Sequence, residues 1–245
     1  MVKLLLVVYL IVILGFDGLE YSLVKEFNLK DLIQKSFGKT DISEFEEPRT
    51  VVIWSSFLAG KNLEKRILSL GKDFWKFKLK KEETFFSKFK KWKAIDVPGF
   101  TYKFEEHKKE RELMKAYFEN NASIQEYEKV VFKIHKENKK EFFECLKQEL
   151  EIIMGYFSLA DSIGHLSFGI KTKMKIIYKE LEEIVKKTKK MIDESPLLII
   201  SDHGMKPIGR YGDHSNYGFW SLNKEINLKN PKITEFRKII ENLQK

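Results

Sequence analysis

Three short apolar runs in this chain of 245 residues each end just before an aspartate. Each run has the length of a strand and is apolar throughout, which is typical of a strand that is buried on both faces. Stretches with helical periodicity separate the runs, so the sequence predicts a parallel sheet between helices. The runs and their aspartates are residues 10–14 with Asp17, residues 152–157 with Asp161, and residues 197–200 with Asp202.

Two long helices are expected between these strands. Ser123 and Glu126 have the spacing of a capping box and predict the start of one helix. A second helical pattern runs over 172–194, and Pro196 ends it before the next strand. The expected fold is α/β: a three-layer αβα sandwich with a mostly parallel central sheet.

The middle of the chain, about 67–121, is rich in Phe, Trp and Lys. We interpret it as a small insertion over the cleft within a single α/β domain that spans 1–245. Residues 94–97 could form a further strand. Aromatic side chains between lysines can stack on bases, but at helical spacing we expect them in the core.

The beginning of the chain, "MVKLLLVVYLIVILGFDG", has an apolar stretch over 4–14. This stretch is shorter than the roughly 20 residues that a membrane helix needs, and no small-residue cleavage site follows it. We therefore expect a buried first strand with Asp17 at its tip, and no membrane association.

The formal net charge of +9 favours an anionic partner. The lysines are spread along the whole chain and no arginine-rich arm is present, so we expect a small anionic substrate and not nucleic acid. Cys145 is the only cysteine, which excludes an internal disulfide and fits a reducing, cytoplasmic setting.

Three histidines accompany the aspartates that follow the apolar runs. His165 lies four residues after Asp161, His203 follows Asp202 directly, and His214 follows Asp213. The carboxyl ends of parallel strands meet at one edge of a sheet, so these groups should gather there. Imidazole and carboxylate are ligands for Zn²⁺, Mn²⁺ or Fe. The sequence thus predicts a metal centre, whereas a single Asp-His pair would be weak evidence.

The other two histidines, His107 and His135, lie in helical stretches rich in Lys and Glu. We expect both to face solvent.

Five segments occur in an order that resembles the alkaline phosphatase superfamily, and most of all its nucleotide pyrophosphatase/phosphodiesterase branch. Together the motifs are specific, although no single one is. They are "FDGLE" at 16–20, "RTVVIWSSFLAGKN" at 49–62, "YFSLADSIGH" at 156–165, "SDHGM" at 201–205 and "GDHSNYGFW" at 212–220.

The resemblance implies two divalent metal ions, with Zn²⁺ as the first choice and Mn²⁺ or Fe as alternatives. It implies a metal-dependent hydrolase of phosphate esters, a phosphodiesterase or nucleotide pyrophosphatase that works through a phosphothreonine. One ion would be held by Asp161, His165 and His214, and the other by Asp17, Asp202, His203 and the hydroxyl of Thr50.

The nucleophile that the resemblance implies is Thr50, ten residues before Gly60. Ser55 and Ser56 are fallback nucleophiles, and their other interpretation is as ordinary helix-capping hydroxyls. Asp213 is expected beside the site and not as a ligand.

The loop around the nucleophile departs from the superfamily pattern. Val52 stands where proline is usual, Ala59 where threonine is common, and Leu63 and Arg66 replace a proline and a histidine. Two alternatives therefore stay open. One is a phosphomonoesterase of the same superfamily, and the other is a protein that has lost catalysis and binds anions or nucleic acid.

Overall fold

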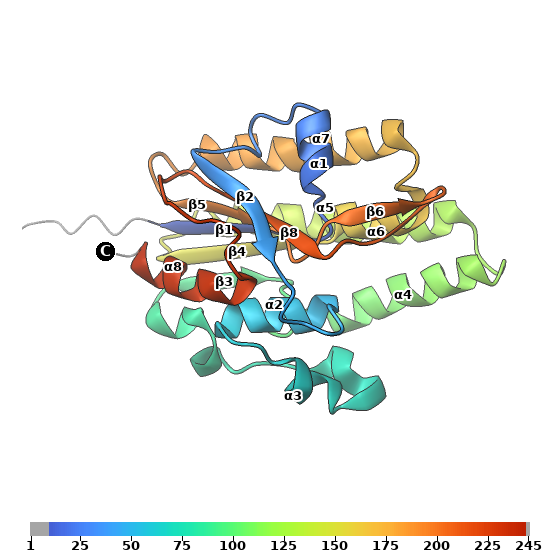
Figure 1. Ribbon diagram of the computed structural model, residues 1–245, viewed down its shortest axis with the longest axis horizontal. Helices are drawn as coiled ribbons and strands as arrows, with labels where there is room; N and C mark the ends of the chain where they lie inside the picture. The colour runs from blue at the N-terminus through green and yellow to red at the C-terminus, as the bar shows by residue number, and fades with distance from the viewer. Residues whose placement is uncertain (1–9, 244–245) are drawn as a thin grey trace, which may run out of the picture.

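The computed structural model describes residues 10–243, so the part of the apolar beginning that falls on residues 1–9 lies outside it. Its centre is a six-stranded sheet in the order β2-β8-β5-β1-β4-β3 (Figure 1). Strands β5, β1, β4 and β3 are parallel, whereas β8 is antiparallel to both of its neighbours. The prediction of an α/β fold with a mostly parallel sheet is confirmed. The strands are β1 (Ile11–Phe16), β2 (Ser36–Asp41), β3 (Trp92–Ile95), β4 (Ile152–Phe157), β5 (Leu197–Ile200) and β8 (Tyr217–Leu222).

Helices cover both faces of the sheet, which makes three layers. Figure 1 shows α7 on one side and α2, α3 and α8 on the other. None of the helices within 10–243 is both long enough and apolar enough to span a bilayer. The helices are α1 (Tyr21–Glu26), α2 (Thr50–Ala59), α3 (Glu64–Leu68), α4 (Phe104–Phe118), α5 (Ile124–Cys145), α6 (Leu159–Ser167), α7 (Lys171–Lys189) and α8 (Phe236–Asn242).

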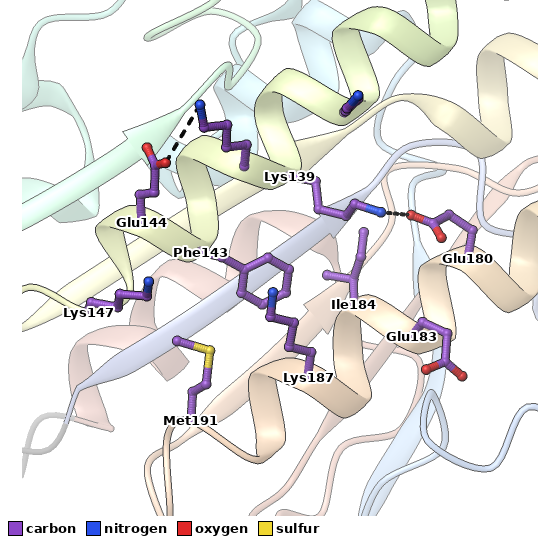
Figure 2. A pocket seen from close by; sticks show the side chains of 11 residues that line it. Lys139, Phe143, Glu144, Lys147, Glu180, Glu183, Ile184, Lys187 and Met191 are labelled. Carbon is purple, nitrogen blue, oxygen red and sulfur yellow. Dashed lines mark hydrogen bonds and ion pairs between the residues drawn. The ribbon is translucent and has the colours of Figure 1, made fainter.

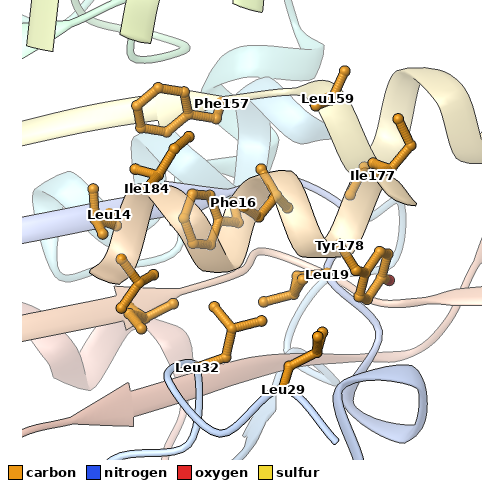
Figure 3. Packing of buried hydrophobic residues seen from close by; sticks show 14 of the residues in the cluster. Leu14, Phe16, Leu19, Leu29, Leu32, Phe157, Leu159, Ile177, Tyr178 and Ile184 are labelled. Carbon is orange, nitrogen blue, oxygen red and sulfur yellow. The ribbon is translucent and has the colours of Figure 1, made fainter. Parts of the chain in front are cut away.

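Strand β1 shows why the runs are apolar throughout. Val12, Leu14 and Phe16 pack into one core together with α5 and α7, as Figure 3 shows for Leu14 and Phe16. Ile11 and Ile13 point to the opposite face and pack against α2 and α8. Successive side chains of a strand alternate between faces, so a strand between two helical layers must be apolar at every position.

The predicted capping box opens α5. The Ser123 hydroxyl accepts from the Glu126 amide at 3.2 Å, and the Glu126 carboxylate accepts from the Ser123 amide at 2.8 Å. The helix predicted over 172–194 is observed as α7 and ends earlier, at Lys189.

The segment predicted as an insertion, 67–121, contributes β3 to the edge of the central sheet. Its aromatic side chains include Phe85, Phe86, Phe89 and Phe100, which are buried in the core on the α2 side. Whether the rest of the segment acts as a cover for the cleft stays a prediction. Its 3₁₀ turns are Gly71–Lys76, Lys81–Glu83 and Phe85–Lys88, and one more, Ile233–Glu235, precedes α8.

The parallel register brings the carboxyl ends of four strands to one edge. Asp17 follows β1 directly, Asp161 follows β4 by four residues, and Asp202 follows β5 by two. A separate two-stranded hairpin of β6 (Met205–Ile208) and β7 (Tyr211–His214) extends from this edge. The hairpin was not predicted, and it carries His214 at the end of β7.

Candidate metal centre

Six residues that the sequence singled out come together at the carboxyl edge of the sheet. They form two groups, and within each group one ligand atom from each residue lies within 4.8 Å of the others. One group is buried and the other is partly exposed. The buried group is Asp17, Asp202 and His203, and the partly exposed group is Asp161, His165 and His214.

Two aromatic side chains orient the carboxylate of Asp17 through hydrogen bonds. Tyr156 donates its hydroxyl proton to Oδ2 at 2.6 Å, and the indole N–H of Trp54 donates to the same oxygen at 3.2 Å. The other oxygen, Oδ1, is buried and has no hydrogen-bond partner within 10–243. It lies 3.4 Å from Nε2 of His203. Holding one oxygen in this way leaves the other available to a cation.

His203 is oriented by the backbone. Its Nδ1 lies 3.0 Å from the carbonyl oxygen of Gly204, to which it can donate. Its Nε2 then carries the lone pair and points at the carboxylates, 3.5 Å from Oδ2 of Asp202. Both Nε2 of His203 and Oδ2 of Asp202 are buried without a partner among the described residues. Buried polar atoms are nearly always satisfied, so this convergence fits a bound cation.

The partly exposed group combines a helix with the hairpin. Asp161 and His165 are four residues apart on α6 and therefore share one face of the helix. Nε2 of His165 lies 3.3 Å from Oδ2 of Asp161 and 3.3 Å from Nε2 of His214. Oδ1 of Asp161 lies 3.6 Å from Nε2 of His214. Three nitrogen and oxygen donors around one point match the ligand number of a catalytic metal that keeps an open position.

The negative charges of the candidate carboxylate ligands repel one another when no cation is bound. Burial raises the pKa of Asp17, and the charge of Asp161 raises it further. Burial, together with the charges of Asp17 and Asp161, raises the pKa of Asp202 well above its usual range. Carboxylates crowded in a buried space resist ionisation together. A divalent cation would remove this conflict.

The histidines offset part of the charge at Asp161. Burial opposes ionisation there, but the charges and hydrogen bonds of His165 and His214 hold the pKa of Asp161 well below its usual range. In turn, the charge of Asp161 raises the pKa of His165 to about 9 against the effect of burial. Metal ligation needs a neutral imidazole, so a metal ion would displace a proton from His165.

Thr50 is the first residue of α2 and is nearly buried, at 9% exposure. It precedes Trp54 by four residues, so both side chains lie on the same face of the helix. On this face the Trp54 indole contacts Asp17. That the Thr50 hydroxyl reaches the buried group stays a prediction. The amide groups of the first turn have no partner within their own helix, and no side chain caps this end.

The fallback nucleophiles are placed differently. Ser56 accepts a hydrogen bond from the Leu63 amide at 3.0 Å, which gives it a role in the helix-to-loop connection. Ser55 is completely buried and lies close to Gly99. Asp213 is half-exposed, pairs with Lys206 at 3.3 Å and belongs to neither group.

The expectation that His107 and His135 face solvent is wrong. They are only 2% and 7% exposed. His107 lies between Asp96 and Glu110, and His135 contacts Glu180 at 3.0 Å. Both are on the buried stripes of amphipathic helices, where a carboxylate partner offsets the cost of burying an imidazole.

A hollow of about 710 Å³ opens beside the partly exposed group. His214 lines it, together with Pro48, which precedes Thr50 by two residues. Hollows of this size accommodate small ligands. Its other lining residues are Glu20, Ser22, Met205, Lys206, Pro207, Ser215, Asn216 and Tyr217.

Another hollow, of about 670 Å³, lies between α5 and α7 (Figure 2). Lysines such as Lys139 and Lys187 line it around Phe143 and Met191. None of the six candidate ligands reaches it. We therefore place the chemistry at the carboxyl edge of the sheet.

Sequence reasoning missed the residues that orient the ligands. Tyr156 lies inside an apolar strand, and its hydroxyl function was not apparent there. Glu20 is buried at 1% exposure, accepts from the Tyr217 hydroxyl at 2.7 Å and from the Met205 amide at 3.1 Å, and so ties the hairpin to the loop after β1. A charged residue in a loop gives no sequence signal of such burial.

No family model matches the chain, and no curated protein matches it by sequence. Solved structures do match it. The chain is similar to the PH0037 protein from Pyrococcus horikoshii, with 11% identity and a TM-score of 0.56, over 95% of this chain and 96% of that one. It is also similar to a mutant of the alkaline phosphatase from the Antarctic bacterium TAB5, with 10% identity and a TM-score of 0.52, over 97% of each chain.

A further match is murine ectonucleotide pyrophosphatase/phosphodiesterase 5, with 15% identity and a TM-score of 0.46. The match covers 82% of this chain and 58% of that chain, so it spans little more than half of the murine protein. At these identities the matches show a shared fold: the chain folds like the PH0037 protein and like the TAB5 alkaline phosphatase. It also carries two candidate metal-binding groups.

Proposed function

Starting from this fold and its two candidate metal groups, we propose that the protein is a metal-dependent hydrolase of phosphate esters with Thr50 as its nucleophile. The observation that carries the proposal is the convergence of six ligand-type side chains, four of whose atoms are buried without partners. Unpartnered buried carboxylates are costly to a folded chain, and a pair of divalent cations would offset that cost.

The residues would divide into two sites. Asp161, His165 and His214 would hold one ion, next to the hollow. Asp17, Asp202 and His203 would hold the other, together with the hydroxyl of Thr50. When bound, the two ions would supply Lewis acidity that neutralises charge on the phosphoryl group and activates a hydroxyl and a water. Three imidazoles and three carboxylates suit Zn²⁺ first, with Mn²⁺ and Fe as alternatives.

Thr50 would act in two steps. Its oxygen would form a bond to phosphorus while the bond from phosphorus to the leaving oxygen breaks, and the leaving alcohol would depart with the threonine proton. Water would then form a bond to phosphorus while the bond from phosphorus to the Thr50 oxygen breaks, and one proton of the water would return to Thr50; a phosphodiester would thus yield a phosphate monoester. The first-turn amides of α2 lack a side-chain cap, and free amides at a helix N-terminus can stabilise phosphoryl oxygens.

Within this class we propose phosphodiesters or nucleotide pyrophosphates as substrates. The motif order supports this branch, and the hollow beside His214 has room for a leaving group on the substrate. Phosphate monoesters are the alternative. The basic chain, with a formal net charge of +9, suits either anion.

The test is hydrolysis of bis-p-nitrophenyl phosphate, a nucleotide pyrophosphate and p-nitrophenyl phosphate, each with Zn²⁺, Mn²⁺ or Fe²⁺ and with a chelator. We expect turnover that needs metal, is faster with the diester or the pyrophosphate, and is lost in Thr50→Ala. Faster monoester cleavage would assign the alternative substrate. Metal binding without turnover of any ester would favour a protein that only binds anions, and would contradict the proposal.

A further inference from the structure

Helix α6 carries two of the candidate ligands on one face, and Ser162 bonds it to two neighbouring helices. The Ser162 hydroxyl donates to Oε1 of Glu110, on α4, at 2.5 Å. The Ser162 carbonyl accepts from the Tyr127 hydroxyl, on α5, at 2.8 Å. Ser162 directly follows Asp161 in the chain, so these two bonds fix the backbone beside a candidate ligand.

Glu110 is itself held by a buried histidine. Its Oε2 lies 2.9 Å from Nδ1 of His107, and Nε2 of His107 lies 2.7 Å from Oδ2 of Asp96. Glu110, His107 and Asp96 are 6%, 2% and 1% exposed. An imidazole donates from both nitrogens only when it is protonated. The three side chains therefore form a charged row with fixed directions.

Asp96 connects this row to the sheet. It directly follows β3, which lies beside β4 at the same carboxyl edge. Its Oδ1 accepts from the Lys103 amide at 2.8 Å, and its Oδ2 accepts from the Asn138 amide group at 2.5 Å. Its backbone has a φ of +57°, a conformation that a non-glycine residue keeps only when its surroundings determine it. Asp96 is thus a rigid anchor.

A buried ionic row is a poor source of stability, because well-packed apolar side chains of similar volume are often as good or better. The distinguishing property of a buried ionic row is that its hydrogen bonds are directional. Directional bonds define the position of a helix more narrowly than apolar packing does. Metal sites need ligand distances within about 0.2 Å of ideal values. Groups that orient the ligands commonly change metal affinity about 10–100-fold when they are removed.

We propose that Asp96, His107 and Glu110 form a positioning network which, through Ser162, sets where α6 presents Asp161 and His165 to one of the two metal ions. The inference rests on the proposed metal centre and adds Asp96, His107 and Glu110, which lie outside the five motifs. None of the four residues is among the candidate ligands, so each acts through α6 and none is a catalytic residue.

The experiment is a calorimetric titration of metal-free protein with Zn²⁺ alone, repeated with Co²⁺ to follow its visible absorption. Ser162→Ala removes the hydroxyl, and Glu110→Gln keeps the size of the side chain but removes its charge. We expect one of the two sites to weaken about 10–100-fold in both variants, with a changed Co²⁺ spectrum. The other site should keep its affinity.

Ser167→Ala is the matched control. Ser167 is a buried serine on the same helix, and its hydroxyl accepts from Lys173 at 3.1 Å, away from the network. This variant should keep both affinities even where its melting temperature falls. Thermal unfolding of the metal-free variants shows whether each one folds. If Ser162→Ala does not fold, the isosteric variant Glu110→Gln provides the test.

The outcomes separate the two proposals. A wild-type protein that binds neither Zn²⁺ nor Co²⁺ would remove the metal centre and the network with it. The second outcome is a wild-type protein that binds two ions, with Ser162→Ala and Glu110→Gln showing the same metal affinities as the control Ser167→Ala. This outcome would overturn the network and leave the proposed function standing. Equal weakening of both sites would also overturn it, because Ser162 links the network to α6, which carries ligands of only one of the two groups.

Discussion

Oδ1 of Asp161 lies 3.9 Å from Nε2 of His203, so the two candidate metal groups adjoin at this pair. Asp161 follows β4 and His203 follows β5, two strands that are separated by β1 in the sheet. Adjoining groups suit two ions about 4 Å apart that act on one phosphoryl group.

Metal ions should stabilise the protein. At a free metal concentration about 100 times the Kd, binding at one site adds about 2.7 kcal/mol. For a chain of this size this corresponds to a rise of about 5–10 °C in Tm. Thermal unfolding with Zn²⁺, Mn²⁺ or a chelator measures the rise. Equal Tm values under all these conditions would contradict a metal centre.

Asp202→Asn should have opposite effects with and without metal. Without metal it removes a carboxylate whose ionisation burial and the neighbouring acids oppose, so the Tm should rise, by about 2–4 °C for each kcal/mol gained. With metal, the rise seen for the wild type should be reduced because one ligand is lost. The comparison needs four melting curves. A variant that is less stable without metal would show that the repulsion is not there.

Gly18→Ala should disturb Asp161. Gly18 has a φ of +66°, and an added Cβ would lie 2.8 Å from Cα of Asp161. Gly71→Ala is a matched control, because Gly71 has a φ of +55° and no atom within 4 Å of its added Cβ. Both lose about 1 kcal/mol from the backbone, but only Gly18→Ala should also weaken Zn²⁺ binding in titration. Unchanged Zn²⁺ affinity would mean that the loop at Gly18 accommodates the added methyl group without moving Asp161.

Ser56→Ala should cost stability and leave turnover unchanged. It removes the hydrogen bond from the Leu63 amide, worth about 1 kcal/mol. Urea unfolding measures the cost, and hydrolysis of bis-p-nitrophenyl phosphate measures turnover. A loss of about 10³-fold in turnover, with Thr50→Ala still active, would move the nucleophile from Thr50 to Ser56.

His107 should make stability depend on pH. Burial lowers its pKa, but the hydrogen bonds to Asp96 and Glu110 outweigh burial and raise the pKa to about 9, from 6.5. A raised histidine pKa adds stability that is fully present below pH 6.5 and is lost as the pH rises to about 9. The contribution is up to about 3 kcal/mol.

Unfolding of the wild type and His107→Gln, both with chelator, isolates this contribution over pH 6–10. The difference between the two cancels the part due to His165, whose pKa is also about 9. We expect the gap between the curves to shrink as the pH rises. A constant gap would show that His107 is not protonated in the folded protein.

The sequence determined the class of fold and the candidate ligands. Strands that are buried on both faces must be apolar at every position, so β1, β4 and β5 were visible as runs, and the aspartates after them were visible as exceptions. The parallel arrangement followed from the alternating helices. These signals are local, since each depends on residues adjacent in the chain.

Only the tertiary structure decided what surrounds these residues. Three features depend on segments that are far apart in the chain. They are the position of His214 on the hairpin, the orientation of Asp17 by Tyr156 and Trp54, and the burial of His107. Asp96 lay inside the strand suggested over 94–97, whereas β3 ends at Ile95, so only the structure shows that Asp96 follows a strand as the other aspartates do. The contact between Asp96 and His107 on α4 could not be predicted, because a helix pattern does not show which buried position meets a distant carboxylate. Composition and periodicity encode burial, whereas the direction of a hydrogen bond is fixed only when the elements have packed.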